Sequence, residues 1–320
     1  MAVTWAGAPI TNPNLQLTYV SATWTPSGDV FACGLGNMGV VLKSTNYGVT
    51  WTQVYSSSSI TGLQGLSSGA VTADGVTYYM VVDDAEGRTY MSSGTGQVWQ
   101  EVNSAGVYLS STAIGTNGYA FAVGFDDTIL RASYPSFNSW APKSTGDVDI
   151  PLWLDVSTPD GINVIIVGTG GKVYYSANSG NSWTAGSSGT SGSIYCVSHA
   201  GPSTTFAMAA GESGYLAKTQ DGGSTWSLMT AHSSNYTVRF RAISLLSTTE
   251  AYLGVFKDPN VNGIPFGLIY RTIDGGSTWS IVASLSAEIY SLSMYSTSYG
   301  VAGSSPGTAI FAIVPGKMLL

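Results

Sequence analysis

KTQDGGSTW at residues 218–226 and RTIDGGSTW at 271–279 are two copies of one nine-residue pattern. Three looser copies precede them: KSTNYGVTW at 43–51, MSSGTGQVW at 91–99 and YSANSGNSW at 175–183. Seven of the nine tryptophans, from Trp5 to Trp279, follow one another at intervals of 41 to 53 residues. A repeat of this length accounts for all 320 residues, so the chain is expected to form a single domain.

The nine-residue pattern has the chemistry of a hairpin turn. Its Asp or Asn can accept hydrogen bonds from backbone N–H groups, its Gly permits a positive φ, and its first Ser or Thr ties the incoming strand to the turn. We call these turns box turns and expect each tryptophan to pack the outgoing strand against a neighbouring sheet. Structural work, not catalysis, is therefore expected of Asn46, Trp51, Asn178, Trp183, Asp221, Trp226, Asp274 and Trp279.

The pattern Ser/Thr-x-Asp-x-Gly-x-Thr/Ser-Trp resembles the Asp-box, or bacterial-neuraminidase, repeat. It is complete at 219–226 and 272–279, has Asn for Asp in two other copies, and is degraded near Trp99 and Trp140. More distantly, the repeats resemble those of photosystem II assembly factors, which are seven-bladed and non-catalytic. Sialidases with this box use an arginine triad on separate blades. None of the five arginines of this chain is expected at such a triad, so sialidase activity is not expected.

Each repeat divides into four short strand patterns. In the fourth repeat these are LWLDVST, NVIIVGT, KVYYSA and SWTAG, separated by PDG, GG and NSGN. Alternating apolar residues between turn residues predict a four-stranded antiparallel meander. Seven such units predict an all-β, seven-bladed β-propeller.

The blades are expected at residues 18–55, 60–103, 107–144, 150–186, 193–230, 236–283, and 287–314 plus 2–8. The last repeat lacks a box turn and a final strand, and AVTWAGA at 2–8 matches the missing strand. We therefore expect the ring to close with the segment around Trp5 beside residues 308–314, which would remove the exposed sheet edges.

Composition excludes several classes of function. Charged residues make up 9% of the chain, the formal net charge is −7, and there is no run of Lys or Arg, so nucleic-acid binding is not expected. No apolar run reaches the eighteen or so residues that span a bilayer, so membrane insertion is not expected, and residues 1–14 lack a signal-peptide pattern. Abundant Ser, Thr, Gly, Tyr and Trp resemble secreted adhesins, lectins and phage virion proteins. An extracellular or virion-surface location is therefore expected, with oligomerisation or virion assembly left open.

The candidate binding residues gather on one predicted face. With strands A to D numbered from the axis outward, box turns share a face with the A–B turns, and the B–C and D–A connections form the opposite rim. Carboxylates expected in the B–C connections are Asp83, Asp84, Asp126, Asp127, Glu212 and Asp258, and the D–A connection before blade four adds Asp147 and Asp149. Such a rim could bind Ca²⁺ or sugar hydroxyls, or its Asp residues could simply form turns. No other cofactor is expected.

Blade six has two further features. Its B–C connection is long, KDPNVNGIPFG at 257–267, and its A strand carries Arg239 and Arg241. These arginines could pair with carboxylates such as Glu288 or Asp155, or one could reach the axial channel and hold an anion or a sugar hydroxyl.

Other candidates are isolated side chains. Trp153 could stack a sugar at the channel mouth, or it could pack between neighbouring blades. His199 and His232 are expected in exposed turns, while Cys33 and Cys196 are expected to be buried and too far apart for a disulfide.

Together these patterns favour a non-catalytic recognition or structural propeller that binds a glycan or a protein through the B–C rim. A carbohydrate-active enzyme that pairs Asp155 with rim carboxylates is the first alternative. A photosystem-type assembly factor is the second.

Overall fold

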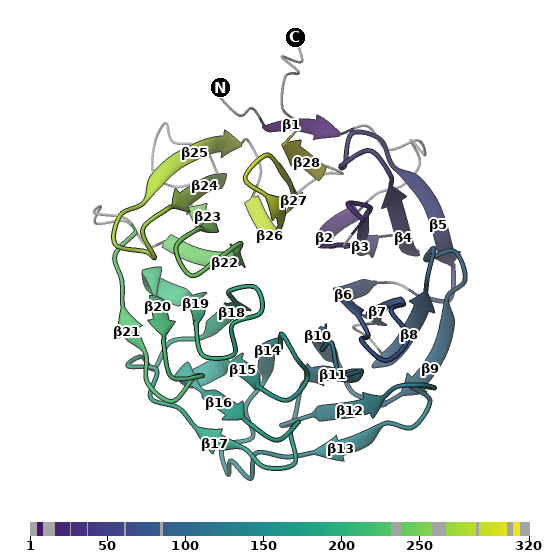
Figure 1. Ribbon diagram of the computed structural model, residues 1–320, viewed down its shortest axis with the longest axis horizontal. Coiled ribbons are helices and arrows are strands. Elements are labelled where there is room, and N and C mark those ends of the chain that lie inside the picture. The colour runs from purple at the N-terminus through teal and green to yellow at the C-terminus, as the bar shows by residue number, and fades with distance from the viewer. Residues whose placement is uncertain are drawn as a thin grey trace.

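The computed structural model describes residues 5–8, 17–25, 27–36, 38–60, 62–83, 86–231, 238–257, 267–285, 288–305 and 310–313. In these ranges seven four-stranded antiparallel sheets surround a central axis (Figure 1). The structure is thus the all-β, seven-bladed propeller that the repeat predicts. No helix in the described ranges is long and apolar enough to cross a membrane.

Six of the blades run outward from the axis, strand by strand in chain order. The first three blades are β2 to β5 (Leu17–Trp24, Val30–Gly36, Gly39–Ser44, Thr52–Ser57), β6 to β9 (Leu63–Ala70, Thr77–Asp83, Arg88–Ser93, Gln100–Ser104) and β10 to β13 (Leu109–Ile114, Tyr119–Gly124, Ile129–Ser133, Ala141–Lys143). The next three are β14 to β17 (Trp153–Ser157, Val164–Gly168, Val173–Ser176, Thr184–Ala185), β18 to β21 (Ile194–His199, Ala207–Gly211, Leu216–Thr219, Ser227–Leu228) and β22 to β25 (Val238–Leu245, Ala251–Lys257, Gly267–Thr272, Ser280–Leu285).

The seventh blade joins the two ends of the chain. Strands β26 (Glu288–Ser296), β27 (Tyr299–Ser305) and β28 (Ile310–Ile313) are followed outward by β1 (Trp5–Ala8). Strand β1 is antiparallel to β28, with Trp5 opposite Ile313 and Ala8 opposite Ile310. Figure 1 shows β1 on the outside of this blade. The predicted closure of the ring is confirmed.

The hydrophobic core lies between neighbouring blades, and box-turn tryptophans help to fill it. Trp51 of blade one is fully buried against Val301, Ile310 and Ala312 of blade seven. Its indole N–H also donates a hydrogen bond to the carbonyl oxygen of Gly48, 3.0 Å away. The tryptophan therefore stabilises its own turn and the contact with the preceding blade.

Hydrogen bonds in the box turns follow the chemistry expected from the sequence. The hydroxyl of Thr272 donates to Oδ1 of Asp274 (2.8 Å) and accepts from the N–H of Gly276 (3.0 Å). The N–H and the hydroxyl of Thr278 donate to the two oxygens of Asp274, at 2.9 and 2.6 Å. Asn46 receives equivalent bonds in blade one, from Ser44 and from the N–H of Thr50. Asp and Asn are thus interchangeable acceptors in this turn.

All seven inner strands contain a β-bulge at corresponding positions. In each pairing of an A strand with its B strand, the inner strand has one extra residue near its start. In β22, for example, Phe240 is opposite Val255 and Ala242 is opposite Gly254, so Arg241 is the extra residue. A bulge redirects side chains relative to the regular alternation of a strand. The bulge positions therefore decide which side chains of the inner strands point toward the axis.

The hydrogen bonds to Asp274 give a prediction about acid stability. Bonds from Thr278 and Thr272 lower the pKa of Asp274 to about 2. Because the folded pKa lies below the usual 3.8, this contribution to stability is present above about pH 4 and is lost as the pH falls toward 2. Asp274→Asn should melt near the wild-type temperature at neutral pH and lose less stability in acid, whereas Asp274→Ala should melt lower at neutral pH. Thermal melts of the three proteins across this range test the turn, and an Asp274→Ala protein that melts like the wild type would contradict it.

Candidate functional site

A small polar cavity lies on the axis of the ring. Its volume is about 140 Å³, and the inner strands of all seven blades contribute to its wall. The bulges supply much of this lining, through Gly65, Ser110, Leu154, Tyr195, Arg241 and Tyr290. The shared irregularity of the inner strands therefore brings non-equivalent side chains from different blades to one place.

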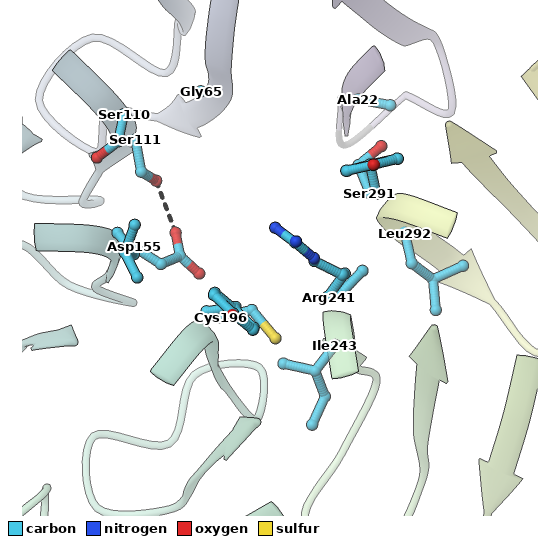
Figure 2. A pocket seen from close by; sticks show the side chains of 14 residues that line it. Ala22, Gly65, Ser110, Ser111, Asp155, Cys196, Arg241, Ile243, Ser291 and Leu292 are labelled. Atoms are coloured by element: carbon cyan, nitrogen blue, oxygen red, sulfur yellow. Dashed lines mark hydrogen bonds between the residues drawn. The ribbon is translucent and has the colours of Figure 1, made fainter. Parts of the chain in front are cut away.

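Arg241 is the cation of this cavity. Its side chain extends toward the open centre of the ring (Figure 2). The guanidinium carbon is 4.5 Å from the ring centre of Tyr195 and 5.5 Å from that of Tyr290, so the cation lies between two aromatic rings. Arg239, the other arginine on this strand, does not line the cavity. Neither arginine forms an ion pair with any carboxylate of the described residues, so the pairing with Asp155 or Glu288 considered from the sequence is not present.

Asp155 lies on the opposite wall of the cavity (Figure 2). Its Oδ1 accepts hydrogen bonds from the hydroxyl of Ser111 (2.6 Å) and the N–H of Val156 (2.9 Å), and its Oδ2 accepts from the N–H of Val197 (2.8 Å). Burial raises the pKa of Asp155 to about 6, although these hydrogen bonds oppose the shift. The carboxylate thus links β10, β14 and β18 and is the single carboxylate among the described residues that line the cavity.

Asp127 links the B–C connection of blade three to the D–A connection that precedes blade four. Its oxygens accept hydrogen bonds from the hydroxyls of Ser144 (2.7 Å) and Thr145 (2.9 Å) and from the indole N–H of Trp153 (2.8 Å). Trp153 is fully buried between blades three and four, so of its two possible roles it packs between blades and does not stack a ligand at the channel mouth. The structural role of Asp127 explains why this carboxylate occurs there without requiring a ligand.

The other rim carboxylates differ in how accessible they are. Asp83 ends β7 and is only 2% exposed, so it does not reach a ligand at the rim surface. Asp147 and Asp149 bind Lys172 at 2.8 and 2.7 Å, and Glu212 accepts a long bond from the N–H of Ser193. Asp126 is exposed. Asp84 and Asp258 lie outside the described residues, as does most of the long loop at 257–267.

Metal binding gains no support from these positions. No group of three His, Cys, Asp or Glu side chains within the described ranges is arranged to hold a metal ion. Ca²⁺ binding at the rim therefore stays a prediction from the sequence.

The two cysteines and His199 lie in strands, away from the rim. Cys33 and Cys196 are buried and form no disulfide with each other, as expected. His199 is also buried, with its Nδ1 2.9 Å from the hydroxyl of Ser157, and burial lowers its pKa to about 4. The expectation that His199 lies in an exposed turn is wrong because it belongs to inner strand β18.

An exposed apolar patch on the rim was not anticipated from the sequence. Phe125 follows β11 and is 42% exposed, while Val148 and Ile150 precede β14 and are 90% and 61% exposed. We call these three residues the rim patch. The N–H of Asp127 donates to the carbonyl oxygen of Pro151 (3.1 Å), which fixes the two segments side by side.

The residues that follow Phe125 in the chain line a hollow, and Ile150 of the rim patch has a strained backbone. The hollow has a volume of about 390 Å³ and is lined in part by Val107, Asp126, Leu130 and Lys143. Ile150 has a φ of +47°, which a β-branched side chain rarely adopts. Such conformations persist where the surrounding structure imposes them, and they are common at functional sites.

The fold and the channel define the class of this protein, a seven-bladed β-propeller with a narrow polar centre. No protein-family model matches the chain, and no curated protein matches its sequence. Among solved structures it resembles YCF48 bound to D1 peptide, with a TM-score of 0.71, 14% identity, and coverage of 100% of this chain and 97% of that one.

It also resembles the RRP9 WD40 repeats, with a TM-score of 0.69, 12% identity, and coverage of 97% of this chain and 99% of that one. A third similar structure is the GH74 xyloglucanase from Xanthomonas campestris, with a TM-score of 0.69 and 13% identity over 97% of this chain and 53% of that one. At these identities the likeness shows the fold alone.

The buried carboxyl of Asp155 gives a second prediction. Because its folded pKa of about 6 exceeds the usual 3.8, its contribution to stability is fully present below about pH 4 and is lost as the pH rises through 6. The loss is on the order of 2–3 kcal/mol at about 1.4 kcal/mol per pKa unit. Thermal melts from about pH 4 to pH 8 should show this decline in the wild type and a flatter profile in Asp155→Asn. Parallel profiles in the two proteins would contradict it.

Proposed function

We propose that this propeller is a non-catalytic recognition module that docks a protein partner through the B–C rim of blades three and four. The observation that carries the proposal is the rim patch of Phe125, Val148 and Ile150 beside the hollow of about 390 Å³. Exposed aliphatic side chains next to a hollow suit a protein surface, because apolar contacts supply most of the free energy of protein association.

A protein partner fits the patch better than a glycan does. Sugar recognition relies on exposed aromatic faces and free polar groups, but the rim patch has one aromatic ring and two aliphatic side chains. Asp127 and Asp147 are already engaged by Ser144, Thr145 and Lys172. The solved structure of YCF48 bound to D1 peptide supports the proposal to the extent that a propeller of similar fold binds a peptide.

Charge indicates what kind of protein surface would dock. Around the patch, Lys172 pairs with Asp147 and Asp149, and Asp126, Asp127 and Lys143 line the hollow. The carboxylates outnumber the ammonium groups there, and the whole chain carries a formal charge of −7. A partner with apolar side chains bordered by Lys or Arg would complement this surface. A second copy of the chain is a poorer fit, because it would bring the same carboxylates into contact.

The finer assignments rest on the sequence. We propose that the repeats are of the Asp-box type and that the protein works outside a cell or on a virion surface, on the basis of the box pattern and the low charge. A photosystem-type assembly factor ranks lower, because the chain has no run of basic residues for docking on that complex.

A carbohydrate-active enzyme is the remaining alternative. Glycoside hydrolases of the common type require two carboxyl groups at a defined separation. Asp155 has no second carboxylate beside it among the described lining residues, and both its oxygens accept hydrogen bonds. The similarity to a xyloglucanase does not supply the missing group.

The proposal predicts which peptides bind and which substitutions prevent binding. A peptide library screened on the immobilised protein should enrich sequences that combine Lys or Arg with apolar residues. The double variant Val148→Ser with Ile150→Ser should bind these peptides at least about tenfold more weakly, because apolar contacts of this size are worth more than 1.4 kcal/mol. Ile273→Ser is the matched control, since Ile273 is 67% exposed in the box turn of blade six, on the opposite face.

Parallel assays separate the alternatives. A glycan array with and without Ca²⁺ and a reducing-sugar release assay should both be negative. Ca²⁺-dependent glycan binding without peptide enrichment would contradict protein docking and favour a sugar-binding rim. Sugar release that is abolished by Asp155→Asn would favour the enzyme.

A further inference from the structure

The guanidinium of Arg241 has an unusual environment for a cation inside a protein. Its described contacts are the faces of Tyr195 and Tyr290, and no carboxylate of the described residues pairs with it. Its Nε is buried and has no hydrogen-bond partner. Aromatic faces stabilise a cation but accept no strong hydrogen bonds from its N–H groups.

A buried donor on a cation costs free energy unless it is paired. Fold stability alone does not explain Arg241, because the bulge in β22 turns the side chain toward the cavity and away from the packed core. An anion in the cavity would supply the missing partner.

The cavity fits a small anion. Its volume of about 140 Å³ has room for a group of a few non-hydrogen atoms. Ser291, whose buried hydroxyl has no hydrogen-bond partner, lines it together with Arg241. Guanidinium groups bind carboxylates through two parallel N–H donors, which match the planar shape of the anion.

We propose that the axial cavity is a carboxylate-binding site in which Arg241 is the residue that binds the anion. The ligand is either a small organic acid or the carboxyl end of a longer chain that enters along the axis. This site is separate from the rim patch, which lies in the B–C and D–A connections of blades three and four.

The wall opposite Arg241 makes binding depend on pH. Asp155 on β14 faces the same cavity, so an ionised Asp155 would repel a bound carboxylate and a protonated one would not. The other titratable groups around the cavity are Tyr195 and Cys196 on β18, Arg239 and Arg241 on β22, and Glu288 and Tyr290 on β26. Burial raises the pKa values of Cys196 and Tyr290, and Tyr290 donates a hydrogen bond to Glu288, so Asp155 is the lining group that titrates nearest neutrality.

Acetate is the probe for the site, and acetamide is its neutral counterpart. In the wild-type protein, acetate should shift the NMR signal of the Arg241 Nε–H group and raise the melting temperature, and acetamide should do neither. Affinity for acetate should rise as the pH falls from about 8 to about 6, and this rise should be absent in Asp155→Asn.

Matched variants assign the effect to one arginine. Arg241→Gln should weaken acetate binding at least about tenfold, as expected for a charge-assisted hydrogen bond of about 1.5–3 kcal/mol. Arg239→Gln removes the same charge from the same strand without altering the cavity lining and should bind within about twofold of the wild type. A short N-acetylated peptide with a free carboxyl end, compared with its C-terminal amide, then distinguishes a chain end from a free acid.

The proposal is overturned if acetate leaves the wild-type Nε–H signal and melting temperature unchanged, or if acetamide acts equally. Equal losses of acetate affinity in Arg239→Gln and Arg241→Gln would also overturn it. They would indicate that acetate responds only to the long-range electrostatic field of the protein and does not contact Arg241. The spectroscopic result needs no variant, so it stands even if Arg241→Gln does not fold.

Discussion

The pairing of β1 with β28 is the contact on which the rest of the ring depends. Seven sheets of this kind form a closed structure only if the last one is completed, and the chain completes it with residues from its own beginning. The closed seventh blade then provides Val301, Ile310 and Ala312 as the surface against which Trp51 of blade one packs. One short strand pair thereby supports the contact between the first and last blades.

Within the closed ring, regular and irregular features have different roles. The box turns repeat nearly the same hydrogen bonds around Asn46, Asn178, Asp221 and Asp274, which makes the outer part of the blades uniform. The bulges also repeat, but the residues in them differ from blade to blade. A structural feature common to all blades therefore presents serine, leucine, tyrosine and arginine side chains to one small volume, and this variety gives the centre its chemistry.

Much of the fold could be predicted because its signals are local. The box pattern specifies a turn within nine residues, and the spacing of tryptophans such as Trp51 and Trp226 specifies the repeat. The channel was harder to predict, since an inserted bulge residue changes the alternation that the sequence suggests for a strand. Arg241 was considered for the axis, but the aromatic faces of Tyr195 and Tyr290 around it depend on bulges in three strands.

One signal for the bulges was present in the sequence. Gly124, Gly168 and Gly211 are the last residues of three B strands. A Cβ at these positions would collide with the carbonyl oxygens of Tyr108, Leu152 and Ser193, respectively, and each of these residues directly precedes an inner strand. Glycine at the end of an apolar strand often marks such a close approach. The role of Asp127 had no comparable signal, because its partners Ser144, Thr145 and Trp153 are 17 to 26 residues away.

Ring closure is tested most directly by removing residues 1–8 and following unfolding by peptide-resolved hydrogen exchange and thermal melting. Loss of β1 should lower the melting temperature by several degrees or more and reduce amide protection together in β27, β28 and the segment around Trp51, because these residues share one core. An unchanged melting temperature with full protection around Trp51 would contradict the account.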